Sequence, residues 1–175
     1  MVVRVVITGG PGGGKTTLVK RLAADGFAVM PESGRAVIIE QRAAGGDALP
    51  WRDRDAFAAS MVDRDVAAWH AATKPVTFFD RGVVDTIGYL TLEGLAVPTR
   101  LDEAARRLRY HDRVFVTPWW PDIYELDAER RQTPEVARAT EIQIGRTYRE
   151  YGYEVLPLPL DTPAVRAAFV RDHLD

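Results

Sequence analysis

Apolar runs alternate with helical patterns along the chain, and this alternation is typical of a parallel α/β sheet. The apolar runs predict five strands, at residues 2–8, 27–30, 76–79, 113–117 and 154–158. The helical patterns between them predict helices at residues 15–24, 33–44, 52–72, 82–92, 101–109, 134–151 and 163–174. No repeat, low-complexity tract or interdomain linker interrupts this order. We therefore predict one α/β domain over residues 1–175, with five parallel strands.

Capping residues mark the ends of two predicted helices. Ser33 is the expected N-cap of the helix at 33–44, because its hydroxyl suits the free backbone N–H groups of a first turn. Thr133 is the expected N-cap of the helix at 134–151, with Pro134 in the first helical position and Gly152 after the end.

The loop after the first strand carries the strongest chemical signature. Residues 9–16 read GGPGGGKT and follow the spacing G-x-x-x-x-G-K-[ST] between a strand and a helix. Glycines let the backbone N–H groups approach phosphate oxygens, and the helix N-terminus adds positive potential. Lys15 is expected to reach the β- and γ-phosphates, and the Thr16 hydroxyl to bind magnesium. The expected nucleotide-binding residues are Gly9, Gly10, Pro11, Gly12, Gly13, Gly14, Lys15, Thr16 and Thr17.

Composition narrows the class of protein. With 46% hydrophobic residues among 175, the chain suits one packed domain. Its 23 basic and 25 acidic residues give a net charge of −2, which does not favour binding to nucleic acid or a membrane surface. The absence of cysteine excludes disulfides and thiolate metal sites. No signal-peptide pattern and no apolar run near 18 residues is present, so we expect a cytoplasmic enzyme, monomeric or homodimeric.

Charged residues follow two of the predicted strands at the edge where ligands bind in open α/β sheets. Asp80 and Arg81 follow the strand at 76–79. Asp80 is a candidate magnesium ligand or proton acceptor, and Arg81 a candidate partner of phosphate charge. Glu32 follows the strand at 27–30 and is a candidate base for a substrate hydroxyl. A strand-end ion pair for Asp80 and Arg81, and a helix-capping role for Glu32, are the structural alternatives.

Four further residues are candidates for contact with a second substrate. Arg35 lies three residues after Glu32 and is expected on the same side of the new helix. Trp51 and Tyr89 offer flat surfaces for stacking, or pack structurally. Asp85 is either a hydrogen-bond partner of a substrate hydroxyl or an exposed helix residue.

Arg130 and Arg131 lie between the strand at 113–117 and the helix at 134–151. Arginines that arrive with a closing cover stabilise charge in a phosphoryl-transfer transition state and help to exclude water. These two therefore predict a lid, and the alternative is a solvated charged turn.

The glycine loop at 9–16, residues 31–35, the pair Asp80-Arg81 and residues 151–153 together resemble the AAA-type P-loop family of small ATPase and kinase domains. They are similar to the nicotinamide riboside kinase domain of bacterial NAD-biosynthesis regulators, and more distantly to thymidylate and deoxynucleoside kinases. The resemblance implies a three-layer P-loop NTPase fold with strand order 2-3-1-4-5, helices on both faces and a short lid.

The resemblance also implies roles for individual residues. Glu32 matches the glutamate that acts as base in deoxynucleoside kinases, and Asp80 and Arg81 match their magnesium-linked and substrate-side pair. Arg130 or Arg131 matches a lid arginine. Gly82 departs from the acidic-Arg-Ser triplet of that family, and the Asp-Arg-Tyr of thymidylate kinases is also missing.

Two functions compete for this set of residues. The first is an ATP- and Mg²⁺-dependent kinase that phosphorylates a hydroxyl of a small molecule, either nucleoside-like or another metabolite or antibiotic. The second is a regulatory NTPase that hydrolyses ATP or GTP without such an acceptor. The strand at 76–79 lacks the Asp-Glu ending of many motor ATPases, and no Asn-Lys-x-Asp segment is present for guanine. We favour the kinase, and a nucleotide-binding module without chemistry is the weakest alternative.

Overall fold

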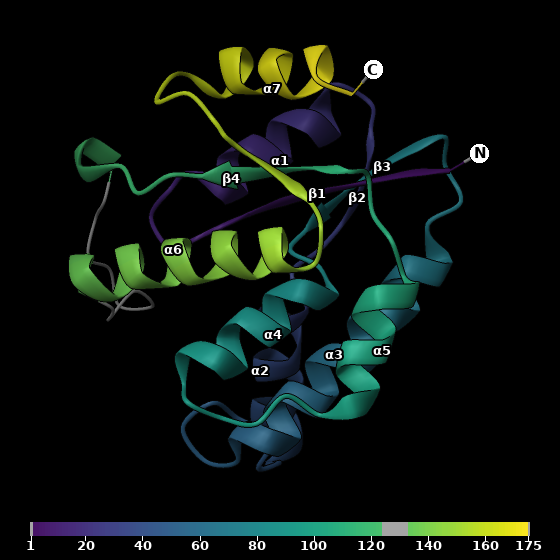
Figure 1. The fold of residues 1–175 in the computed structure, drawn as a ribbon, viewed down its shortest axis with the longest axis vertical. Coiled ribbons are helices and arrows are strands. Elements are labelled where there is room, and N and C mark those ends of the chain that lie inside the picture. Colours follow the sequence, from purple (N-terminus) through teal and green to yellow (C-terminus); the bar gives the residue numbers. More distant parts are fainter. Residues whose placement is uncertain (1, 124–132, 175) are drawn as a thin grey trace.

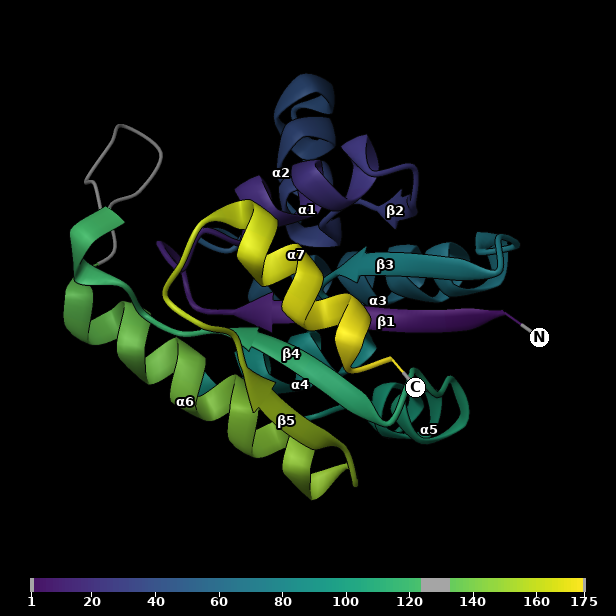
Figure 2. The ribbon, with the colours of Figure 1, turned by 90° about the horizontal axis from the view of Figure 1, so that it is seen from above.

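The computed structural model describes residues 2–123 and 133–174, and it forms one five-stranded parallel sheet (Figure 1). The strands lie side by side in the order β2-β3-β1-β4-β5, as expected (Figure 2). Their bounds are β1 Val3–Gly9, β2 Ala28–Met30, β3 Val76–Asp80, β4 Arg113–Thr117 and β5 Glu154–Pro157. Because all strands are parallel, their carboxyl ends meet at one edge, where ligands bind in such sheets.

Helices cover both faces of the sheet. Their bounds are α1 Lys15–Ala24, α2 Ser33–Ala44, α3 Arg54–Ala71, α4 Val83–Leu92, α5 Thr99–Arg107, α6 Pro134–Glu150 and α7 Pro163–Asp172, with a 3₁₀ turn at Pro121–Ile123. Helices α1 and α7 lie on one face, α6 and α4 lie on the other, and α2, α3 and α5 extend the second layer (Figure 1). The fold is therefore the expected three-layer α/β arrangement. Among the described residues, no helix has the length and apolar character needed to cross a membrane.

Alternation along the strands creates two separate cores. Val5 and Ile7 of β1 are fully buried in the cluster that also contains residues of α1 and α7. Val6, between them, belongs to the cluster under α3, α4 and α6. On β3, Phe78 belongs to the first of these clusters and Phe79 to the second. Strand side chains point alternately to opposite faces, so a continuous apolar run is what a sheet covered on both faces requires.

The observed helix bounds follow the prediction to within two residues, but one predicted N-cap differs. Thr133 caps α6, and its hydroxyl accepts a hydrogen bond from the Val136 amide at 3.4 Å. The prediction of Ser33 as N-cap of α2 is wrong: Glu32 is the extended capping residue, and Ser33 is already helical and buried. The Ser33 hydroxyl instead donates to Asp65 of α3. A tertiary contact therefore takes the place of the local one.

The loop that leaves β1 approaches β4 too closely for a side chain. Gly9 has φ +135°, and a Cβ there would lie 2.5 Å from the Thr117 carbonyl oxygen and against the Thr117 hydroxyl. This contact holds the start of the loop against the sheet.

We expect Gly9→Ala to lower the free energy of unfolding by more than about 2 kcal/mol, because it combines backbone strain with a clash. The measurement is urea unfolding followed by circular dichroism. Gly26→Ala is the matched control, since Gly26 also has positive φ but has no atom within 4 Å of the added Cβ. The control should lose only about 1 kcal/mol. Equal losses in the two variants would contradict the role of close packing.

Candidate functional site

The glycine-rich loop has the backbone geometry that its sequence predicts. Gly12 and Gly14 have φ values of +81° and +74°, in the left-handed region that glycine tolerates best. Gly14 directly precedes α1, and Lys15 is the first helical residue. The first turn of α1 contains no acidic side chain, so the positive potential of its N-terminus is not offset locally. Strand, loop and helix together have the backbone geometry that suits an anion.

A cavity of ≈ 1230 Å³ opens beside this loop. Residues from Gly10 to Thr17 line one part of it, and residues of α2, α3, α4 and α6 line the rest. Thr16 and Thr17 are exposed there. The predicted acceptor-site residues that line the same cavity are Glu32, Arg35, Trp51, Arg81, Asp85 and Tyr89. Gly9 and Asp80 are not among the lining residues, because Gly9 ends β1 and Asp80 lies behind Lys15. The structure thus joins the phosphate loop and the proposed second site in one space.

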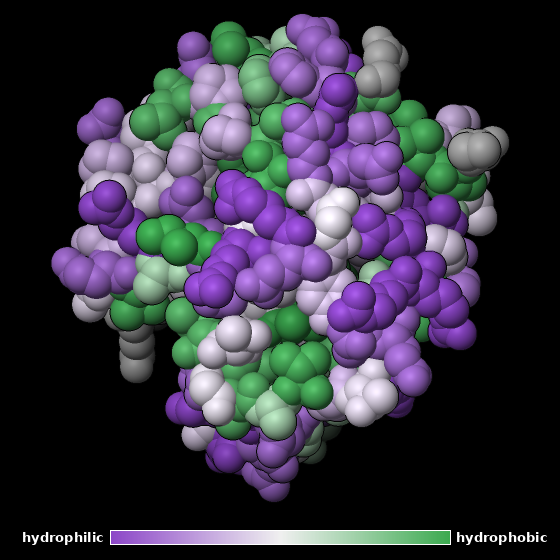
Figure 3. Space-filling model, viewed as in Figure 1, coloured by the Kyte–Doolittle hydropathy of each residue, from purple (hydrophilic) through white to green (hydrophobic). Residues whose placement is uncertain are grey.

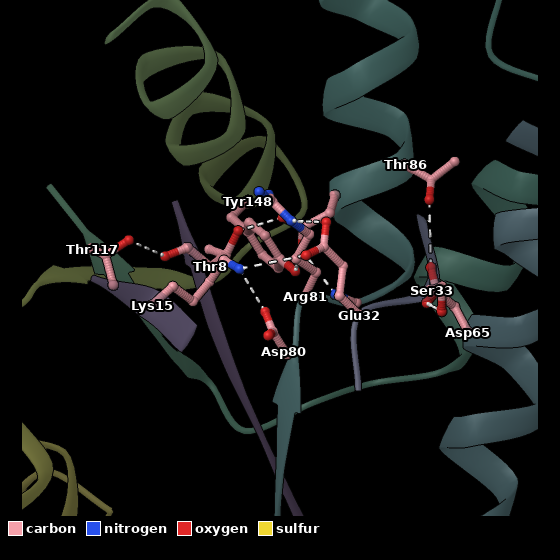
Figure 4. A network of polar contacts seen from close by, with 12 residues as sticks. Thr8, Lys15, Glu32, Ser33, Asp65, Asp80, Arg81, Thr86, Thr117 and Tyr148 are labelled. Carbon is pink, nitrogen blue, oxygen red and sulfur yellow. Dashed lines mark hydrogen bonds and ion pairs between the residues drawn. The ribbon is translucent and has the colours of Figure 1, made fainter. Parts of the chain in front are cut away.

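Lys15 is held at the inner end of the cavity by two carboxylates. Its Nζ lies 2.6 Å from Oδ1 of Asp80 and 3.9 Å from Oε2 of Glu32 (Figure 4). Lys15 and Asp80 are both buried, so each charge needs the other. Asp80 at the end of β3 therefore positions the lysine that the loop motif predicts to contact phosphate.

Arg81 enters the cavity from a strained backbone. Within residues 2–123 and 133–174 it is the one non-glycine residue with positive φ, at 73°. Such a conformation costs roughly 1 kcal/mol or more. Its Nε donates to Oε1 of Glu32 at 3.2 Å, and its Nη1 to Oδ1 of Asp85 at 3.3 Å. The strain directs the guanidinium toward these carboxylates and away from the strand that precedes it.

Asp85 is buried and is engaged by the protein itself. Its carboxylate accepts hydrogen bonds from Thr8, from the Gly82 amide at 2.8 Å, from the Tyr148 hydroxyl at 2.6 Å and from Arg81. The alternative of an exposed helix residue is therefore wrong. A carboxylate has about four acceptor positions, so these donors leave little capacity for a substrate hydroxyl. The geometry favours Asp85 as the residue that caps α4 and orients Arg81.

Glu32 is ionised by its surroundings. Partial burial alone would raise the pKa of its carboxyl, but the positive charges of Arg81, Lys15 and Arg35 outweigh that effect and lower the pKa from 4.5. Glu32 lines the cavity, whereas Asp80 does not. Of the two candidate bases, Glu32 is therefore the one that a ligand in the cavity can reach.

Sequence reasoning missed a second buried carboxylate in the cavity wall. Asp65 of α3 accepts hydrogen bonds from Ser33 of α2 and from Thr86 of α4, the latter at 3.4 Å. Burial raises the pKa of Asp65 to about 7, partly opposed by the Ser33 hydrogen bond. No local signal marks this group, since its three members come from three helices.

Arg166 of α7 was also missed. Its guanidinium is almost fully buried, and Nη1 donates to the Gly13 carbonyl at 2.8 Å. A Cβ on Gly14 would lie 2.8 Å from the same Nη1. Arg166 therefore braces the phosphate loop from the side opposite the cavity wall formed by α2 and α3.

Arg130 and Arg131 lie outside the described residues, so the lid stays a prediction. Among the residues that are described, no group of three or more His, Cys, Asp or Glu side chains is arranged to hold a metal. The candidate magnesium ligands are the Thr16 hydroxyl, which is exposed beside the loop, and Asp80.

Comparison with known proteins agrees with this geometry. Residues 4–166 match the AAA domain family. No curated protein matches the chain. Among solved structures, the NadR protein in complex with NR (nicotinamide riboside) aligns with a TM-score of 0.66 and 21% identity, over 99% of this chain and 50% of that one. This chain thus spans half the length of the NadR chain.

Two single-domain kinases align over nearly their whole length. Thymidylate kinase from Ehrlichia chaffeensis has a TM-score of 0.66 and 14% identity, over 99% of both chains. Shikimate kinase from Acinetobacter baumannii, in complex with shikimate, has a TM-score of 0.55 and 14% identity, over 98% of this chain and 90% of that one. At these identities the likeness establishes the fold. The sheet order, the glycine loop and the family match together show that this chain belongs to the AAA domain family and has the P-loop kinase fold.

Proposed function

We propose that this protein is a phosphotransferase that uses ATP and Mg²⁺ to phosphorylate a hydroxyl group of a small molecule. One observation carries the proposal: the phosphate loop and the ionised carboxylate of Glu32 face the same cavity. Both a hydrolase and a kinase need a residue that positions the nucleophile, but a kinase also needs a binding space for its acceptor, which the rest of this cavity supplies. The P-loop kinase fold of the structural neighbours supports the same reading.

The loop fits a nucleoside triphosphate. Its backbone N–H groups and the N-terminus of α1 suit phosphate oxygens, and Lys15 is already positioned by Asp80 to contact them. The Thr16 hydroxyl would hold magnesium directly, and Asp80, which pairs with Lys15 and does not line the cavity, would contribute through a water molecule. When bound, the nucleotide supplies the phosphoryl group and the metal offsets part of its negative charge.

The chain's own groups then have distinct tasks. Glu32 accepts the proton of the acceptor hydroxyl as that oxygen bonds to the γ-phosphorus and ADP leaves with the β–γ bridging oxygen, which requires the carboxylate to be ionised. Arg81 holds Glu32 in place through the Nε–Oε1 hydrogen bond and faces the cavity with its positive charge. Asp85 fixes Arg81 in turn.

The acceptor half of the cavity suits a flat, partly apolar molecule. Phe57, Met61 and Tyr89 line it, and Trp51 lies half exposed at its edge. The rings of Phe57 and Tyr89 meet edge to face at 5.9 Å. Apolar side chains also gather on the surface of the helical layer below the sheet (Figure 3). We therefore propose a nucleoside-like acceptor, in keeping with a neighbour that binds nicotinamide riboside.

Kinase and switch NTPase are separated by acceptor dependence. ADP release is measured with ATP and Mg²⁺ alone and with nicotinamide riboside, thymidine, cytidine, adenosine or shikimate added. We expect one nucleoside to raise the rate at least about a hundredfold, because a positioned hydroxyl replaces water as the nucleophile. An unchanged rate with every acceptor would instead favour the regulatory NTPase.

Lys15→Ala should reduce phosphoryl transfer by about 10³-fold, because it removes the cation that stabilises the transferred group. The measurement is steady-state ADP release at saturating ATP. Lys20→Ala is the matched control, since Lys20 is exposed on the same helix and does not line the cavity. Near-normal turnover in the Lys15 variant would exclude the loop as the site of chemistry.

Glu32→Gln should reduce transfer by about 10²-fold or more while ATP affinity stays within a small factor, because the amide cannot accept the proton. Calorimetric ATP binding and single-turnover rates check the two parts. Glu40→Gln, on the exposed side of α2, is the control.

Glu32 also sets an expectation for pH. Its lowered pKa keeps the carboxylate charged at every pH above its ordinary value of 4.5. The rate of the chemical step should therefore show no acid limb assignable to Glu32 between about pH 5 and neutrality. A Glu32-dependent fall in rate within that range would show that the carboxyl becomes protonated there, which would contradict its lowered pKa.

A further inference from the structure

Three helices converge on a carboxylate that forms no ion pair with any residue of the described ranges. Asp65 of α3 is 7% exposed and lines the cavity. Ser33 of α2 donates to its Oδ1, and Thr86 of α4 lies 3.4 Å from its Oδ2. Figure 4 shows these three side chains together, apart from the cluster around Lys15 and Arg81. The group therefore lies at a place distinct from the candidate base.

Asp65 differs from the other buried carboxylates. Asp80 has Lys15 at 2.6 Å, and Asp85 has Arg81 at 3.3 Å. Asp65 forms no ion pair with any described residue. A buried carboxylate without a positive partner is costly in its charged form, so a structure that keeps one facing a cavity leaves a place for a positive or donating group.

The charged and titratable groups around Asp65 do not supply that partner. Arg81, just before α4, favours the ionised form, and Asp85 of α4 opposes it. Tyr110 lies before β4. Burial raises the pKa of its hydroxyl, and the negative charge of Asp65 raises it further. On α2, the contact is the neutral hydroxyl of Ser33. The balance of burial and these neighbours leaves the pKa of Asp65 at about 7.

The hydrogen-bonding capacity of Asp65 is only half used. A carboxylate offers about four acceptor positions, and the two hydroxyls occupy two of them. Among the other lining residues, Phe57 and Met61 belong to α3 itself, and Tyr89 follows Thr86 on α4. A ligand ring that packs against these side chains can place a hydrogen-bond donor on the free acceptor positions of Asp65.

We propose that Asp65, held by Ser33 and Thr86, is a specificity subsite that binds an N–H donor or a positive charge on the ring of the acceptor and rejects an anionic ring substituent. The identification of this ligand as the phosphoryl acceptor rests on the proposed function. The ligand class is a hydroxylated molecule whose flat ring carries an amide, an amine or a cationic nitrogen. Glu32 faces the reacting hydroxyl, and Asp65 selects the ring.

The test compares riboside pairs that differ at one ring substituent. Nicotinamide riboside and nicotinic acid riboside share the sugar and the ring, but one carries a carboxamide and the other a carboxylate. Adenosine and purine riboside differ by one amino group. Calorimetry on the intact protein measures binding without any phosphoryl transfer. We expect the donor-bearing member of at least one pair to bind at least about tenfold more tightly, as for a charge-assisted hydrogen bond.

Asp65→Asn should reduce that ratio to within about threefold, because the neutral amide neither attracts the donor nor repels the carboxylate. Asp63→Asn is the matched control: it lies on the same helix, is exposed and pairs with Arg100 at 3.0 Å on the surface. The control should keep the wild-type ratio. A ratio that survives in Asp65→Asn, or no preference for a donor in the wild type, would overturn the proposal.

A purely structural role for Asp65, as a tie between α2, α3 and α4, predicts a different readout. Binding of a donor favours the ionised carboxylate and lowers its pKa, so at pH 7 the wild type should release a fraction of a proton. Heats measured in two buffers of different ionisation enthalpy detect it. A structural tie would release none. Should Asp65→Asn fail to fold, the selectivity of the wild type tests the proposal instead. The ratio of affinities within a riboside pair must then decrease as the pH falls from about 8 to about 5.

Failure of this proposal differs from failure of the proposed function. Riboside binding that depends on Asp65 without acceptor-dependent ADP release would leave the subsite intact and refute the kinase. Acceptor-dependent ADP release with selectivity unchanged in Asp65→Asn would leave the kinase intact and refute the subsite.

Discussion

Two cations and three carboxylates form one ion-pair network beside the glycine loop, and their mutual compensation constrains the surrounding structure. Lys15 lies against Asp80 and within 3.9 Å of Glu32, and Arg81 joins Glu32 to Asp85. Removing one partner from such a set leaves a buried charge, which is strongly destabilising. The glycine loop, the end of β3 and the starts of α2 and α4 are thereby held in one arrangement, and their relative positions define the site.

The strain at Arg81 makes sense within this network. Positive φ is unfavourable for an arginine, but the ion pairs with Glu32 and Asp85 keep the side chain directed into the cavity. Asp85 is fixed in turn by Thr8 of β1 and Tyr148 of α6. The orientation of one cavity-facing guanidinium therefore depends on residues from the first strand to the sixth helix. Asp65 forms no ion pair within this network, although Arg81 and Asp85 affect its pKa, and this leaves its carboxylate available to select a ligand.

The features that could be predicted from the sequence are those that depend on residues close together in the chain. Strand alternation, the spacing of the glycine loop and the Thr133-Pro134 cap are local, so the sheet and the nucleotide loop could be predicted closely. Glu32 and Arg81 could be placed because both follow strands. The wrong N-cap at Ser33 and the missed Asp65 have one cause, since the hydroxyl that suits a cap turns to a helix that is packed beside it. Arg166 is 153 positions from its carbonyl partner, and no local pattern connects them.

That long separation bears on how the protein is made. The chain is synthesised from its N-terminus, so residues 9–16 emerge early, but the guanidinium that braces Gly13 comes from α7. Until α7 has emerged and docked beside α1, the loop lacks this support. A nucleotide present during translation should therefore do little for the nascent chain, and should bind tightly only after α7 has docked beside α1.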